Sequence, residues 1–368
     1  MRGRVDVQGG MFYTINMEDL VPPDHPLRAI RRMADAELVR LQPVFNDSYS
    51  RIGRPSIPPE QLIKALLLQA LYSVRSERQL CEQIAYNFLF RWFLDLSPEA
   101  PAWNHSSFSK NRERFEEHGL VRRFFESTVA HAIEREAAGS EHFSVDGTLI
   151  QAWGSLKNFR PKDEPDDPEA GGGGSNRWVD FHGERRSNAT HECKTDPQAR
   201  LARKGQGAIL AHSLHALMDN RHGLLLEVSV TEASGRAERE AAEAMLRRVR
   251  RRHWLAPKTL GADKGYDDGA FLRRLEKQHH VEPHVAIRGG VIRGEDDNAK
   301  ARRRARARAR SMAYRVSQRC RRRIEETFSW LKHIAGMGKA RFAGRWKIQL
   351  NAWAAAASYN LMRLAKTG

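Results

Sequence analysis

The chain has 368 residues, with 62 Lys and Arg against 45 Asp and Glu, which gives a net charge of +17. Its eight Trp and fifteen Phe exclude a chain that is disordered throughout, and its length favours about two domains. A basic excess of this size on a folded chain predicts a polyanionic partner.

Residues 1–138 are predicted to form a helical region. Apolar residues recur at helical spacing in 25–41 and in 120–136, and a further helix is expected to begin near Ser107 and to end at Gly119. Short helices joined by short turns favour a DNA-binding helix-turn-helix and an ordinary helical bundle about equally. In the first case the helix near Ser107 would enter a groove of DNA with Lys110, Arg112 and Arg114.

Beyond residue 139 strands begin to alternate with helices. Short apolar runs, several with a period of two, predict strands at 143–147, 209–218, 224–231, 259–262 and 281–287. Helices are predicted at 236–252, 267–277, 324–334 and 351–366. Because helix-linked crossovers tend to place their strands side by side and parallel, this order predicts an α/β domain over 139–368, with a mixed five-stranded sheet flanked by helices. Residues 152–206 are charged and rich in glycine, so we expect an irregular insertion there.

Two aspartates stand where predicted strands end. Asp146 ends the first strand, and Asp263 follows the strand 259–262. Open α/β sheets build their sites at the carboxyl ends of strands, so both are candidate site residues. Each also has an ordinary alternative, because Asp146-Gly147 is a common hairpin-turn dipeptide and Asp263 can simply cap a turn.

A third carboxylate is expected on the helix 324–334. If Ile324 marks the buried stripe of that helix, then Arg321, Glu325 and Lys332 fall about 60°, 100° and 80° from it, on a single edge. Glu326 falls about 200° away. The row suits a metal-binding carboxylate between two cations that contact phosphate, and it equally suits an exposed helix edge with an Arg321–Glu325 ion pair.

Three carboxylates that converge without counterions repel one another unless a divalent cation joins them. Oxygen ligands of this kind suit Mg²⁺ or Mn²⁺. Two such ions roughly 4 Å apart activate a water or a 3′-hydroxyl on one side of a phosphodiester and stabilise the leaving oxygen on the other. The basic charge of the chain would then hold the nucleic acid.

Several segments are weak signals singly but specific when taken together and in order. They are Tyr72-Ser-Val-Arg-Ser-Glu-Arg-Gln-Leu80 within Pro58–Leu96, Ser144-Val-Asp-Gly-Thr148, Thr195-Asp-Pro with Arg200-Leu-Ala-Arg-Lys-Gly205, Gly261-Ala-Asp-Lys-Gly-Tyr266 and Arg323-Ile-Glu-Glu-Thr-Phe-Ser-Trp-Leu-Lys332. Over nearly the whole chain, the sequence resembles a bacterial insertion-sequence transposase of the DDE class.

The resemblance implies an RNase H-like catalytic domain over 139–368, preceded by a helical N-terminal transposase domain over 1–138. It implies that Asp146, Asp263 and Glu325 are catalytic and bind two Mg²⁺ (or Mn²⁺) ions, with Arg321 and Lys332 as DNA-binding helpers. Related transposases often carry a Tyr three residues before this Arg, where the present chain has Gln318 and its nearest Tyr is Tyr314.

The implied activity is that of a DNA transposase. Such an enzyme binds the terminal inverted repeats of an insertion sequence, cleaves the element ends with Mg²⁺ and joins the freed 3′-hydroxyl to target DNA. Its expected partners are double-stranded DNA and further copies of itself, as a homodimer or larger assembly on DNA. The alternatives are an RNase H-like nuclease without strand transfer and a catalytically silent, transposase-derived DNA-binding protein.

Other features of the sequence bear on its ligands and on its cellular location. The sequence contains no phosphate-binding Gly-x4-Gly-Lys loop, so ATP use is not indicated. No apolar run approaches the roughly 18–20 residues that span a bilayer. The three cysteines fit no zinc or redox spacing, which favours a reducing compartment. We therefore expect a protein of the bacterial cytoplasm, associated with the nucleoid.

A run of arginines precedes the helix that carries Glu325. Residues 300–323 contain one Lys and eleven Arg. Phosphate contact without base specificity is expected here, and the alternative is an exposed, partly disordered loop whose charge is incidental. The expected contacts are Arg302, Arg303, Arg304, Arg306, Arg308 and Arg310.

Overall fold

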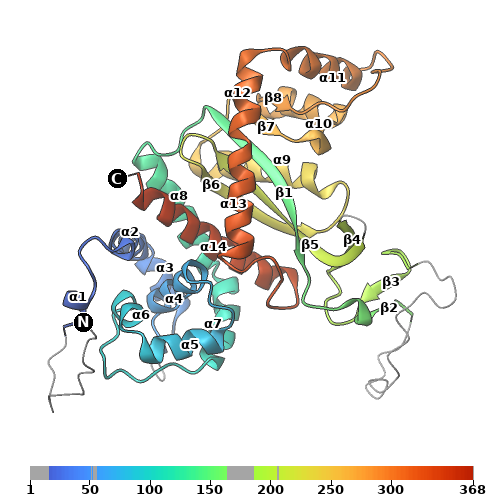
Figure 1. Cartoon of the computed structure of the whole chain (residues 1–368). Coiled ribbons are helices and arrows are strands. Elements are labelled where there is room, and N and C mark those ends of the chain that lie inside the picture. The colour runs from blue at the N-terminus through green and yellow to red at the C-terminus, as the bar shows by residue number, and fades with distance from the viewer. Residues whose placement is uncertain (1–15, 51, 53–55, 164–185, 205–206, 368) are drawn as a thin grey trace, which may run out of the picture.

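The computed structural model describes residues 16–50, 52, 56–163, 186–204 and 207–367 (Figure 1). Its N-terminal part is helical, as predicted. The helices are α1 (Met17–Leu20), α2 (Pro26–Arg40), α3 (Gln42–Ser48), α4 (Pro59–Leu71), α5 (Glu77–Tyr86), α6 (Phe88–Phe93), α7 (Ser106–Glu117) and α8 (Leu120–Glu134). The predicted helix stop at Gly119 is confirmed, because this residue adopts the left-handed conformation, with φ 59°, between α7 and α8.

A mixed sheet forms the centre of the remaining chain. Its strands are β1 (His142–Gln151), β4 (Arg200–Lys204), β5 (Gly207–Asp219), β6 (Leu224–Glu232), β7 (Thr259–Ala262) and β8 (Glu282–Val285). One edge of β5 pairs antiparallel with β1, and the other pairs antiparallel with β6 and, further along, with β4. On the far side of β1, β7 and then β8 follow in parallel. The five predicted strands are therefore present in one mixed sheet, and β4 is an addition to it.

Helices cover the sheet. They are α9 (Ala237–His253), α10 (Gly269–Arg274) with the following π-helix η4 (Leu275–His279), α11 (Asp297–Arg308), α12 (Met312–Cys320), α13 (Arg322–His333) and α14 (Arg345–Ala365). Figure 1 shows α12 and α13 as a nearly continuous rod in front of the sheet, with α9 behind it. The predicted buried stripe of α13 is confirmed, since Ile324, Phe328 and Leu331 are all buried. None of the helices in the described ranges is long and apolar enough to cross a membrane.

The insertion 152–206 is more regular than expected. Within it, β2 (Phe159–Pro161) pairs with β3 (His191–Cys193), and β4 joins the main sheet. A small second core of Ala152, Phe159, Cys193, Ala199 and Leu210 holds these strands together. A few buried residues thus order three short strands within a segment whose overall composition is polar. Residues 164–185 lie outside the described residues.

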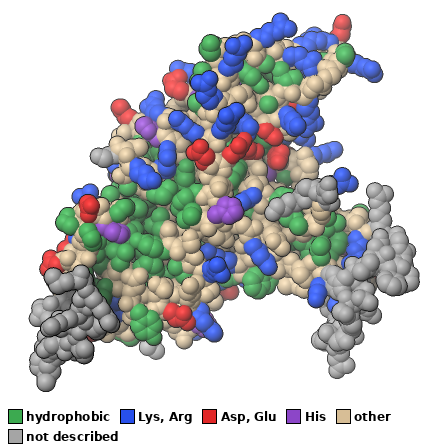
Figure 2. Space-filling model, viewed as in Figure 1, with side chains coloured by type: hydrophobic (Ala, Val, Ile, Leu, Met, Phe, Trp, Pro, Cys, Tyr) green, Lys and Arg blue, Asp and Glu red, His purple; other side chains and the backbone are tan. Residues whose placement is uncertain are grey.

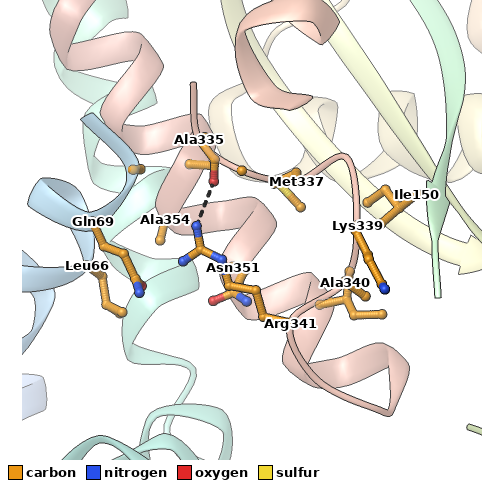
Figure 3. Close-up of a pocket in the computed structure, with 14 residues that line it drawn as sticks. Leu66, Gln69, Ile150, Ala335, Met337, Lys339, Ala340, Arg341, Asn351 and Ala354 are labelled. Atoms are coloured by element: carbon orange, nitrogen blue, oxygen red, sulfur yellow. Dashed lines mark hydrogen bonds between the residues drawn. The ribbon is translucent and has the colours of Figure 1, made fainter. Parts of the chain in front are cut away.

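The helical region and the sheet share one hydrophobic core. The last helix, α14, contacts α2, α4 and α8 on one side and β6 on the other, and buried residues of both regions belong to a single cluster. Near this junction, the loop after α13 closes a cavity of about 30 Å³ against Leu66 and Gln69 of α4, and Arg341 donates a hydrogen bond to the Ala335 carbonyl (Figure 3). No acidic side chain lines this cavity. It therefore belongs to the packing between the two regions.

Candidate active site

The two candidate aspartates lie on neighbouring strands. The parallel pairing of β1 and β7 ends at Ser144 and Gly261, and each aspartate follows two residues later. Asp263 comes directly after β7, as predicted, and its Oδ1 accepts a hydrogen bond from the Gly265 N–H at 2.7 Å. The prediction that Asp146 ends its strand is wrong, because β1 continues to Gln151 along β5. That continuation also excludes the alternative of a hairpin turn at Asp146-Gly147.

Glu325 lies on the edge of α13 that faces β1. The Arg321 guanidinium, at the start of α13, lies between two carboxylates, with 3.2 Å to Asp146 Oδ2 and 3.2 Å to Glu325 Oε1. About two turns beyond Glu325, Lys332 Nζ donates to Thr148 Oγ1, on the same face of β1 as Asp146. Figure 2 shows acidic side chains gathered on this face, near the level where α12 passes into α13, with Lys and Arg around them.

The electrostatics of Asp146 reflect this crowding. Burial is the main cause that raises the pKa of Asp146 to about 6, and the nearby Asp263 and Glu238 charges add to it. The Gly147 N–H, which donates to Asp146 Oδ1 at 2.8 Å, and the Arg321 guanidinium act in the opposite direction. Negative charge is thus concentrated around the partly buried Asp146, and the Arg321 guanidinium compensates for only part of this charge.

Sequence reasoning missed Glu238, which lies in the first turn of α9. A Cβ placed on Gly147 would be 3.3 Å from Glu238 Oε1, and one placed on Gly265 would be 3.1 Å from Glu238 Oε2. The side chain therefore reaches the backbone beside both aspartates. The only signal in the sequence was an acidic residue at the start of the predicted helix 236–252, which is a common N-terminal feature of helices.

These carboxylates offer the oxygen donors that Mg²⁺ and Mn²⁺ prefer. In the described part of the chain, no three His, Cys, Asp or Glu side chains already form a compact ligand set. The Arg321 guanidinium lies between Asp146 and Glu325 and keeps these two carboxylates apart. The donor chemistry and the uncompensated charge fit divalent ions, provided that Arg321 turns away from one carboxylate.

Five of the six arginines expected to contact phosphate lie on α11, and three of the six pair with carboxylates. Arg302 pairs with Asp267 at 3.0 Å, and Arg304 and Arg308 both pair with Glu276. Arg303 and Arg306 donate to backbone carbonyls, and Arg310 is exposed. Half of the six thus fasten α11 to the segment 267–276, and phosphate contact by the six stays a prediction.

On α7 only Lys110 is exposed among the three predicted DNA contacts. Arg112 is buried, pairs with Glu77 of α5 and lies 4.0 Å from the centre of the Phe342 ring. Arg114 stacks on Tyr49 with 4.3 Å between its guanidinium carbon and the ring centre. Arg112 is thus a packing residue and not a reader of base edges, because α7 turns it towards the junction with the catalytic region.

A wide groove of about 750 Å³ lies between the α4–α5 turn and the loop after α13. Its lining includes the cations Arg75, Arg78 and Lys339, together with Trp153, whose surface is 54% exposed. His333 also lines it and directly follows Lys332, the residue bound to β1. The groove therefore begins beside the row of active-site residues. Gln318, at the position of the absent Tyr, donates to the Ala262 and His284 carbonyls at the ends of β7 and β8.

The strand order, with acidic residues on β1, after β7 and on α13, defines an RNase H-like fold. Residues 138–361 match the family model described as "Transposase DDE domain", and residues 15–114 match "Transposase domain (DUF772)". The chain belongs to the DDE transposase family and is a metal-dependent DNA transposase.

Solved structures of the Mos1 transposase are also similar to the chain. The paired-end complex with left transposon end is 12% identical and covers 80% of this chain and 83% of that one, with a TM-score of 0.22. The Mos1 strand transfer complex is 12% identical, covers 80% and 82%, and has a TM-score of 0.20. The mariner Mos1 paired end complex with Mg is 13% identical, covers 82% and 87%, and has a TM-score of 0.22. No curated protein matches the chain.

Proposed function

We propose that this transposase binds the terminal inverted repeats of an insertion sequence, cleaves the element ends with Mg²⁺ or Mn²⁺ and joins the 3′-hydroxyl to target DNA. The observation that supports it most is the grouping of Asp146, Asp263 and Glu325 around β1, with Arg321 between two of them. Two divalent ions held by these carboxylates would activate the water or 3′-hydroxyl and stabilise the leaving oxygen.

The other residues act on the DNA. Arg321 and Lys332 flank Glu325 on one helix edge and are proposed to bind the phosphates on either side of the scissile bond. The groove with Arg75, Arg78 and Lys339 provides a basic path from that point towards the helical region. We further propose that the transposase works on double-stranded DNA as a homodimer or larger assembly, without ATP, in the bacterial cytoplasm at the nucleoid.

The test uses a labelled donor end and a target plasmid with Mg²⁺. The wild type is expected to nick the end and to join it to the plasmid. Asp146→Asn and Asp263→Asn are expected to lose both reactions, while their affinity for end DNA in a gel shift stays within about twofold. Nicking without joined product would identify a nuclease, and binding without nicking a silent DNA-binding protein. Cleavage that survives in either variant would remove that residue from the site.

A further inference from the structure

Glu238 places a fourth carboxylate at this site. A Cβ on Gly265 would lie 2.9 Å from Asp263 Oδ1 and 3.1 Å from Glu238 Oε2, so the two carboxylates converge on one point. The other oxygen of Glu238 lies against Gly147, next to Asp146. Among the described residues, no ion pair or hydrogen bond holds the Glu238 side chain. Burial and the Asp263 charge raise the pKa of Glu238, and the nearby charges of Arg239 and Arg288 lower it without forming an ion pair.

Two buried polar side chains, His215 and Tyr266, lie beside these carboxylates. His215 is fully buried and pairs with Gly147 across β1 and β5, and its Nδ1 would be 3.0 Å from a Cβ on Gly147. Tyr266 is also fully buried, and the pKa of its phenol is raised by burial and then by the charges of Glu238, Asp146 and Asp263. Neither His215 Nδ1 nor Tyr266 Oη has a hydrogen-bond partner among the described residues. Buried polar atoms without a partner are rare in folded proteins.

The hydrogen bonds of His215 show that its missing partner is a hydrogen-bond donor. Its Nε2 lies 2.8 Å from Thr231 Oγ1, and the Thr231 hydroxyl donates its single hydrogen to the Glu232 carbonyl. Nε2 must therefore be the donor to Thr231, which leaves a lone pair on Nδ1. Burial lowers the pKa of His215 to about 4, so the ring is neutral. The lone pair and the carboxylate oxygens are all electron-pair donors, and a cation with its bound water would satisfy them together.

We propose that Glu238 is a fourth metal ligand, which together with Asp263 and Asp146 holds one divalent ion on the side of the site away from Arg321. His215 is a positioning residue that accepts a hydrogen bond from a water on that ion. This inference rests on the proposed function in that it shares Asp146 and Asp263. It adds an order of binding: the Glu238 side takes up a cation readily, whereas the Glu325 side first requires Arg321 to move.

Metal binding to the full-length protein without DNA tests this proposal. Free Mn²⁺ is followed by electron paramagnetic resonance during titration. Glu238→Gln is expected to weaken the tighter class of sites at least tenfold, and Glu325→Gln to leave that class nearly unchanged. The control is Glu240→Gln, an exposed residue in the same turn of α9, which is expected to bind as the wild type does.

A second readout separates ligation from a structural role. In EDTA, Glu238→Gln is expected to raise the melting temperature, because it removes a charge that Asp146 and Asp263 repel, whereas loss of a structural contact would lower it. In the wild type, Fe²⁺ with peroxide is expected to cut the backbone near Gly147, Gly265 and the start of α9. Cuts that avoid α9, or Mn²⁺ affinity unchanged in Glu238→Gln, would overturn the inference. If Asp146→Asn and Asp263→Asn also bind Mn²⁺ normally, the proposed function falls with it.

Discussion

At the scale of single residues, adjacent glutamates on α13 receive different environments. Both are exposed, but Glu325 contacts Arg321, which also contacts Asp146, whereas Glu326 has no ion pair among the described residues. Glu325→Gln should reduce metal-dependent cleavage by two or more orders of magnitude, and Glu326→Gln should change it little. Single-turnover cleavage at saturating Mg²⁺ compares the two variants. If Glu326→Gln is inactive and Glu325→Gln is active, Glu326 and not Glu325 is the catalytic glutamate.

The raised pKa of Asp146 predicts how cleavage responds to pH. A carboxyl group with a pKa of about 6 stays protonated up to that pH, so it becomes a metal ligand only above it. Cleavage should therefore fall tenfold per pH unit once the pH drops below about 6. Because protons and metal compete for the same oxygens, more Mg²⁺ should move the midpoint to lower pH. A midpoint that does not respond to Mg²⁺ would assign the titration to another group.

Residue types and local spacing predicted part of this site. The row of Arg321, Glu325 and Lys332 follows from helical geometry, and Asp263 follows from the end of an apolar strand. The position of Glu238 could not be predicted in this way, because it depends on where α9 meets β1 and β7, which are distant in the sequence. Arg112 shows the same limit, since its partners Glu77 and Phe342 come from both ends of the chain.

At the scale of elements, α11 divides its arginines between two roles. Arg302, Arg304 and Arg308 are neutralised by carboxylates, whereas Arg303, Arg306 and Arg310 have no carboxylate partner among the described residues. We propose that Arg303, Arg306 and Arg310 bind the phosphates of DNA. The sequence predicted the charge of this segment but not its division, because the partners Asp267 and Glu276 belong to an earlier part of the chain.

Two triple variants test this division with the same change of charge. Replacing Arg303, Arg306 and Arg310 by Gln should flatten the dependence of log K on log salt for DNA binding, by up to about 0.9 per lost phosphate contact, with little change in melting temperature. Replacing Arg302, Arg304 and Arg308 by Gln should lower the melting temperature and affect the salt slope less. Equal salt slopes in the two triple variants would contradict the division.

At the scale of the whole molecule, the shared core predicts that the chain unfolds as one unit. The helical region was predicted from sequence as a separate domain over 1–138, but α14 packs on α2, α4 and α8, and such contacts between distant segments have no local pattern. Calorimetry of the full chain should show one transition. Residues 1–138 alone should melt without cooperativity and bind a hydrophobic dye, because the apolar surface under α14 would be exposed. A cooperative melt of the fragment would show that it folds by itself.

The place of α14 at the end of the chain also affects how the protein matures during synthesis. This helix covers residues Arg345–Ala365, whereas the helices it completes end with α8 at Glu134. At about 5–20 residues per second, a ribosome takes on the order of 10–45 s to make the intervening segment. Throughout that time the nascent helical region lacks its closing helix, so a prematurely terminated polypeptide would leave translation with an unfinished fold.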